Sequence, residues 1–182
     1  MRAHSSGRGK TSRVVFLVVG GLAALAMLAF ACAAFARKAS HEGWPRVNGR
    51  LLMNHHDQSR PLIGHPTRHN ELLGGHGSDT ITAGQVGDII WGDYKPCCQP
   101  SHQVDRIYGG AGKDFIYASH GRNYIFTGGG PDVVHAHFGA RGSEIHCDAP
   151  GVLVYMSHKR RSHYKLYGCK RISYSTERMR RG

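Results

Sequence analysis

The feature that most constrains the fold is a nine-residue repeat in the middle of the 182-residue chain. Its best copies read GGHGSDTIT at 74–82 and GGAGKDFIY at 109–117. Further units occupy 83–91, 118–126 and 127–135, weaker ones occupy 65–73 and 100–108, and an eight-residue insert at 92–99 shifts the frame once. Position six holds an acid or amide in every unit: Asn70, Asp79, Asp88, Asp105, Asp114, Asn123 and Asp132. Such a period indicates a solenoid, in which each unit must stack on its neighbours.

The two halves of the unit predict its conformation. The leading glycines permit turn conformations that other residues avoid, and the last three residues are extended with only position eight facing inward. Two units then make one coil, and the inward residues stack into a dry core: Leu72, Ile81, Ile90, Ile107, Ile116, Ile125 and Val134. Tyr117, next to Ile116, is predicted to point outward. The fold class is therefore all-β, a right-handed parallel β-roll.

The units resemble the GGxGxDxUx nonapeptide of RTX, or hemolysin-type, calcium-binding repeat proteins. The resemblance covers roughly 65–135. It implies calcium between stacked turns, held by carboxylate and backbone carbonyl oxygens. The ligand positions that it implies are Gly74, Gly75, Gly77, Asp79, Asp88, Asp105, Gly109, Gly110, Gly112, Asp114, Gly128, Gly130 and Asp132.

Stacking pairs each unit with the second unit after it. This places Asp88, Asp114 and Asp132 on one edge, and Asp79, Asp105 and Asn123 on the other. We expect the first edge to bind calcium better, because all three of its side chains are acids. The alternative for every one of these residues is a hydrogen-bonding turn residue with no metal.

The amino end predicts targeting to a site outside the cytoplasm. Residues 14–36 are uncharged and follow a basic stretch, which is typical of a hydrophobic helix that serves as a signal peptide cleaved after Ala36 or as a retained membrane anchor. Cys32 leaves lipid attachment open. We expect a leader at 1–36, an amino-terminal cap at 37–64, the roll at 65–146, and capping strands with a basic tail at 147–182.

The charges gather at the ends of the chain. The net charge is +12, with 24 Lys and Arg against 12 Asp and Glu. Residues 159–182 hold nine cations against Glu177, whereas residues 37–158 hold eleven charges of each sign. This balance argues against a uniformly basic nucleic-acid-binding domain.

Cysteine and histidine leave several possibilities open. Beyond the leader, Cys97, Cys98, Cys147 and Cys169 allow three pairings, and a Cys147–Cys169 bridge would pin the tail to the last coil. A zinc site from Cys97, Cys98 and His102 lacks the usual spacing. His135 and His137, with His120 and His146 near them, form either a transition-metal cluster or plain polar surface.

No catalytic motif is present, so we expect no enzyme. The favoured function is calcium binding by a secreted or membrane-anchored, non-catalytic roll. The alternative is a metal-free envelope-interaction module, in which the tail Lys159–Arg181 binds anionic polymers or lipid headgroups.

Overall fold

The described part of the chain is a parallel β-solenoid built from short strands. The computed structural model describes residues 43–55, 58–94 and 102–174, so the predicted helix within 1–36, the pair Cys97 and Cys98, and the tail beyond 174 lie outside the described residues. The strands are β1 (Leu51–Met53), β2 (Leu62–Ile63), β3 (Glu71–Leu73), β4 (Thr80–Thr82), β5 (Ile89–Trp91), β6 (Val104–Tyr108), β7 (Phe115–Tyr117), β8 (Arg122–Phe126), β9 (Val133–His135), β10 (Ser143–His146), β11 (Leu153–Tyr155), β12 (Tyr164–Tyr167) and β13 (Arg171–Ser173). A one-turn helix, α2 (His158–Arg161), precedes β12.

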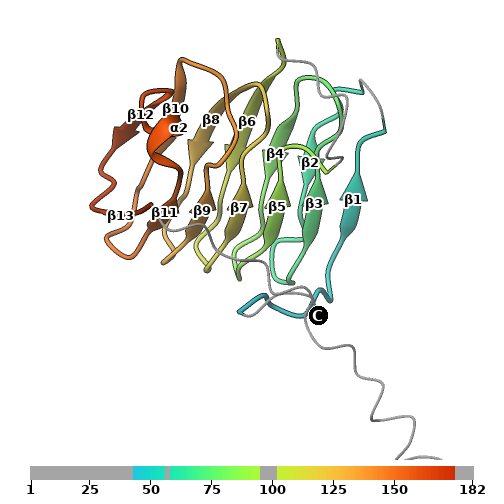
Figure 1. Ribbon diagram of the computed structural model, residues 1–182. Helices are drawn as coiled ribbons and strands as arrows, with labels where there is room; N and C mark the ends of the chain where they lie inside the picture. The colour runs from blue at the N-terminus through green and yellow to red at the C-terminus, as the bar shows by residue number, and fades with distance from the viewer. Residues whose placement is uncertain (1–42, 56–57, 95–101, 175–182) are drawn as a thin grey trace, which may run out of the picture. The chain divides into compact units, whose positions relative to one another are not determined.

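The strands alternate between two sheets, as the nine-residue period predicts. The odd-numbered strands form a seven-stranded sheet in the order β1 to β13, and the even-numbered strands form a six-stranded sheet from β2 to β12. Figure 1 shows the odd-numbered strands side by side, coloured in chain order. All pairs are parallel, and each unit pairs with the second unit after it. The predicted stacking is confirmed.

One aliphatic residue from each strand fills the space between the sheets. In the odd-numbered sheet, Ile116 pairs with Ile90 and Val134 in the neighbouring strands. All seven predicted core residues are completely buried, and Ile145 and Val154 extend the same rows. The alternation is confirmed in the strands of the repeats, because the inward residue is the buried one while its neighbours stay partly accessible, with Ile89, Phe115 and His135 as exceptions.

The outer faces of the sheets carry stacked rings at position nine. On the odd-numbered sheet, Trp91, Tyr117, His135 and Tyr155 stack in succession with centroids 4.0 to 5.2 Å apart. Trp44 packs edge-on against Trp91 and Tyr117, and its indole N–H donates to the Tyr117 hydroxyl. Tyr117 thus points outward as predicted, but it lies in a packed row. This row ties the segment before β1 to the coils.

The segments predicted as caps continue the solenoid. β1 and β2 pair with β3 and β4, and β11 to β13 extend both sheets beyond residue 146. They belong to the same stack because Leu62 and Val154 supply inward aliphatic residues although their surroundings lack the glycine pattern. The described residues include no helix that is long and apolar enough to cross a bilayer.

The buried aliphatic row predicts a large difference between two Ile→Ala substitutions. Ile116→Ala removes a completely buried side chain and should lower the free energy of unfolding by about 2–5 kcal/mol. Ile63→Ala, at a residue that is 55% exposed, should change it by less than about 0.5 kcal/mol. Urea unfolding followed by circular dichroism measures both values, and equal losses would contradict the assigned alternation.

Candidate calcium-binding turns

The position-six residues form two rows at the amino ends of the strands. Asn70, Asp88, Asp114 and Asp132 precede β3, β5, β7 and β9, and we call these four residues the first row. Asp79 precedes β4, while Asp105, Asn123 and Ser143 lie in β6, β8 and β10; these four form the second row. All eight residues are buried. The structure therefore brings the predicted acids together in the two predicted groups.

Asp88 and Asp114 in the first row each close their own turn and also bind the coil before it. Oδ2 of Asp114 accepts from the backbone N–H of Gly110 at 2.7 Å, four residues earlier. Oδ1 of Asp114 accepts from the backbone N–H of Asp88 at 2.6 Å, one coil earlier. Asp88 repeats both bonds, to Gly84 and to Asn70. The carboxylates therefore act as hydrogen-bonding links between coils.

The second row begins with acids and ends with neutral side chains. Asp79 accepts from the N–H of Gly75 and from the side-chain amide of Asn54, and its own N–H donates to Asp105. In the coil after Asp105, the side-chain oxygen of Asn123 accepts a hydrogen bond from the backbone N–H of Ser119. The backbone N–H of Asn123 donates to the Ser143 hydroxyl. Asn and Ser reproduce the closing bonds without charge.

The turn glycines leave oxygen-lined positions between the coils. A Cβ on Gly109 would lie 2.0 Å from the carbonyl oxygen of Thr127 and 2.9 Å from Oδ2 of Asp114. A Cβ on Gly130 would lie 1.8 Å from the carbonyl oxygen of Gly112 and 2.8 Å from Oδ1 of Asp132. At these positions a carbonyl oxygen and a carboxylate oxygen approach the same backbone, so only glycine fits.

Gly74 lies in the same arrangement, between the carbonyl of Gly92 and Oδ2 of Asp79. The other predicted glycines pack against neighbouring backbone. A Cβ on Gly110 or Gly128 would meet the carbonyl oxygen of Gly84 or Gly110, and one on Gly112 would meet Val86. Gly77 has φ +115°, and its N–H donates to the side chain of Gln103. The glycines thus allow the close stacking of turns on which the oxygen-lined positions depend.

In the part of the chain that the structure describes, two buried carboxylate oxygens have no hydrogen-bond partner: Oδ2 of Asp132 and Oδ2 of Asp105. In the unit of Asp132, the closing bond is diverted. Gly128 has φ +83°, and its N–H donates to Asp148 instead, at 3.2 Å. Asp148 also donates its backbone N–H to the Thr127 hydroxyl. The last turn of the first row is therefore held by a residue from outside the repeats.

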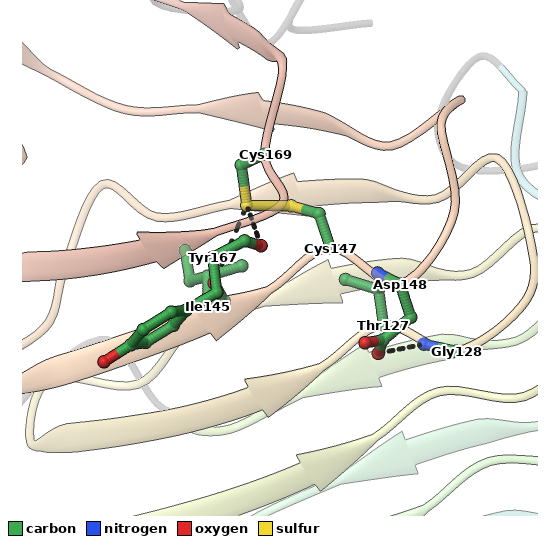
Figure 2. Close-up of a disulfide and its surroundings, with 7 residues drawn as sticks. All are labelled: Thr127, Gly128, Ile145, Cys147, Asp148, Tyr167 and Cys169. Atoms are coloured by element: carbon green, nitrogen blue, oxygen red, sulfur yellow. Dashed lines mark hydrogen bonds between the residues drawn. A yellow bond between two sulfur atoms is a disulfide. The ribbon is translucent and has the colours of Figure 1, made fainter.

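A disulfide fixes the residue next to Asp148. Cys147 and Cys169 are joined, and Figure 2 shows the bridge beside Asp148, Thr127 and Gly128. This is the bridge that the sequence left open. It connects β10 to the segment between β12 and β13, so it also pins the chain end to the last coils.

Asp105 follows the insert, and its Oδ1 accepts from the N–H of Asp79 while its Oδ2 has no partner among the described residues. The insert supplies Asp93, whose side chain is 3% exposed and accepts from the side chain of Gln103 at 2.6 Å and from the N–H and ring of His120 at 2.7 and 3.0 Å. Neither Asp93 nor Asp148 was predicted as a site residue, because neither occupies position six of a unit. Only their contacts in the fold reveal them.

Burial raises the pKa of four of these carboxyl groups. The pKa rises to about 7 for Asp105 and Asp114, and to about 6 for Asp79 and Asp132, in each case mainly because burial removes water from the charged form. Neighbouring acids add to the effect: Asp132 and Asp88 act on Asp114, and Asp148 acts on Asp132. A bound cation would relieve both costs.

The four histidines that the sequence suggested as a metal cluster do not form one group: His120, His135, His137 and His146. His135 lies in the ring row of the odd-numbered sheet with His137 6.2 Å away, whereas His146 stacks between Phe126 and Tyr167 on the even-numbered sheet. Across residues 43–55, 58–94 and 102–174, no three His, Cys, Asp or Glu side chains are grouped so as to hold a metal ion. Cys97 and Cys98, which the sequence left open as zinc ligands of poor spacing, lie outside the described residues.

The donor set therefore fits a hard cation only if backbone carbonyls take part. Ca²⁺ accepts six to eight oxygen ligands from carboxylates and carbonyls in flexible geometry. The turns offer buried carboxylates, two unpaired carboxylate oxygens and closely approaching carbonyls of Gly92, Gly112 and Thr127. The residues present fit calcium in this sense.

Comparison with known families gives one match. Residues 68–93 and 104–134 match the RTX calcium-binding nonapeptide repeat, in four copies. The expected resemblance is confirmed over these residues, which include the first row and every member of the second row except Ser143. No curated protein and no solved structure matches the chain significantly.

The raised pKa values predict how the stability of the metal-free chain depends on pH. A carboxyl group with pKa 3.8 when unfolded and about 7 when folded holds its proton more tightly in the folded state. The free energy of unfolding should therefore fall as the pH rises from about 4 to about 7. Asp105→Asn removes one such group, and Asn123 shows that an amide fits this row.

The measurement is thermal unfolding of the full chain in chelator at a series of pH values. Asp105→Asn should have a shallower decline of melting temperature with pH than the wild type, while Glu71→Gln, a change on the outer face of β3, should keep the wild-type slope. All three chains share the same histidines. An unchanged slope in Asp105→Asn would show that Asp105 titrates normally.

Proposed function

We propose that this chain is a non-catalytic calcium-binding roll that works outside the cytoplasm, with calcium stabilising the stacking of its coils. One observation carries the proposal: buried acids and backbone carbonyls from neighbouring coils converge at the glycine turns, and two of the carboxylate oxygens lack a partner. The match to the RTX calcium-binding repeat supports it over the same residues.

Different turns would use different residues to hold the ion. In the first row these are Asp114 and Asp132, with the carbonyls of Thr127 and Gly112. In the second row they are Asp79 and Asp105, with the carbonyl of Gly92. Bound calcium supplies positive charge that offsets the repulsion between buried carboxylates. Because these residues belong to successive coils, binding and coil stacking would be coupled.

The hydrogen bonds between coils explain why bound calcium would act on the stability of the fold. Without a cation, the carboxylates already accept backbone N–H groups from the preceding coil, so the stack has a connected framework. Burial disfavours the charged form of Asp79, Asp105, Asp114 and Asp132. Calcium would remove this cost and make the same framework more stable near neutral pH.

Two features support a location outside the cytoplasm. The uncharged stretch 14–36 after a basic segment is typical of an export signal or membrane anchor. The Cys147–Cys169 disulfide is of the kind that persists in oxidising compartments. Millimolar calcium is available there.

A non-catalytic role is supported by how the polar residues are used. The buried acids are engaged in turn closure, and the sequence has no recognised catalytic motif. The pairs His120–Asp93 and His146–Glu144 have no nucleophile beside them among the contacts of the described residues.

Calcium should raise the melting temperature of the full chain, and magnesium should raise it far less. Mg²⁺ requires a smaller octahedral shell and gives up water reluctantly, which a carbonyl-rich turn serves poorly. Calorimetry in chelator and then in millimolar Ca²⁺ or Mg²⁺ measures the shift. Glu71→Gln, which removes a carboxylate outside both rows, should keep the full calcium response. Melting curves that do not change with calcium would exclude the proposal.

The two rows should differ in their contribution. Asp114 has acids in both adjacent coils, Asp88 and Asp132, whereas Asp79 has Asp105 on one side and the amide of Asn54 on the other. Asp114→Asn should therefore remove more of the calcium-induced rise in melting temperature than Asp79→Asn. Isothermal titration of both variants measures the lost sites. A larger loss for Asp79→Asn would place the stronger site in the second row.

A further inference from the structure

The surface of the roll is far more basic than the residue counts between 37 and 158 predict. The acids Asp79, Asp88, Asp105, Asp114 and Asp132 are buried, and the Asp93 side chain is nearly so. Among the described acids, this leaves Glu71, Glu144 and Asp148 accessible. Every described Lys and Arg is exposed except Arg160, which is half-buried. The equal counts therefore do not describe the surface, because the negative charges lie inside.

The cations gather where the last coils begin. Arg122 opens β8, Arg141 lies two residues before β10, and Arg161 lies three residues before β12. These strands are parallel neighbours, with Tyr124 paired to Glu144 and Glu144 to Lys165. Their amino ends therefore share one edge of the even-numbered sheet. We call Arg122, Arg141, Arg160 and Arg161 the basic rim.

The rim is not neutralised within the described residues. Arg160 contacts the Gly139 carbonyl and the ring of His163, and Arg161 donates to the Tyr164 carbonyl. No Lys or Arg in the described part of the chain lies within 4 Å of a carboxylate. The one carboxylate on these three strands, Glu144, lies 3.4 Å from His146. Because a guanidinium group has five N–H donors, Arg160 and Arg161 still have donors for an anion beyond those used in these contacts.

The interior beneath the rim is also neutral. Along the second row, the acids Asp79 and Asp105 give way to Asn123 and Ser143 at the coils that carry the rim. The amide of Asn123 donates to the carbonyls of Ser119 and Gly121, so this turn is closed without charge. The change from acid to amide separates the calcium-binding turns from the rim along the same edge.

Phe138 supplies an exposed aromatic ring next to the residue that contacts Arg160. Phe138 is 47% exposed, its carbonyl accepts from the Tyr164 hydroxyl, and one face of its ring lies near His120 at 4.3 Å. The next residue, Gly139, provides the carbonyl that binds Arg160 and His163. An exposed ring at this position, one residue from the carbonyl that contacts Arg160, suits a sugar ring. It is too small for a row of stacked bases, and a lone apolar side chain anchors weakly in a bilayer.

We infer that the basic rim binds a linear acidic polysaccharide. Neighbouring strands are about 4.8 Å apart, so a linear polymer that crosses β8, β10 and β12 would meet one or two arginines near the start of each strand. A polymer with carboxylate or sulfate groups along its length would lie across the three strands and place a sugar on Phe138. This inference does not depend on calcium, because the rim and the acid turns use different residues.

The test measures binding of the full chain to heparin and to polygalacturonate, with and without calcium. Arg122→Gln, Arg141→Gln and Arg161→Gln combined should weaken binding roughly tenfold and flatten its salt dependence by about one unit of slope per lost cation. The matched control removes three exposed arginines at the other end of the stack, Arg46, Arg60 and Arg68. A second control removes Arg178, Arg180 and Arg181 of the tail.

The rim variant with three lysines in place of the arginines separates charge from folding. It should retain most of the affinity, and all variants should keep the wild-type calcium response. An equal loss of affinity in the Arg46, Arg60 and Arg68 control would show that binding depends only on net charge. A loss of affinity in the tail control alone would show that the polysaccharide binds the tail and not the rim. Tighter binding to anionic vesicles or to single-stranded DNA than to either polysaccharide would overturn the assignment of the partner.

Discussion

The structure depends on one repeated interaction, the hydrogen bond from a backbone N–H to the buried position-six side chain of the next coil. In the first row this bond runs from Asn70 to Asp88, from Asp88 to Asp114 and from Asp114 to Asp132. It satisfies backbone donors that the turns would otherwise bury without a partner. It also fixes the spacing between coils, so the aliphatic residues two positions later meet in register. Turn closure and core packing therefore have the same origin.

This interaction has an electrostatic consequence. Placing carboxylates inside the stack removes them from water and raises the pKa of Asp105 and Asp114 to about 7. It also removes negative charge from the surface, where Lys and Arg remain. The proposed binding of a cation at the turns and of an anionic polymer at the rim would thus both follow from this separation of charge. Asn123 and Ser143, which are neutral, lie between the turns proposed to bind calcium and the basic rim.

The two unpaired carboxylate oxygens occur where the repeat departs from its pattern. At Asp132, the N–H that would close the turn binds Asp148, which lies beside the Cys147–Cys169 disulfide. At Asp105, the insert replaces the usual turn and brings Asp93 against His120 and Gln103. In regular units such as that of Asp114, both oxygens are occupied by backbone N–H groups. The irregular units are therefore the places where a buried carboxylate oxygen remains available to a ligand.

The nonapeptide period by itself determined the parallel stacking, the buried aliphatic rows from Leu72 to Val134 and the grouping of the acids into two rows. These features follow from local rules, because a fixed period places equivalent residues above one another in any solenoid. The sequence could not predict that β1, β2 and β11 to β13 extend the stack, since their strands lack the glycine signature. Nor could it predict the roles of Asp93 and Asp148 or the basic rim. These depend on contacts between residues about 20 or more positions apart and on which charges become buried, and only the folded chain decides both.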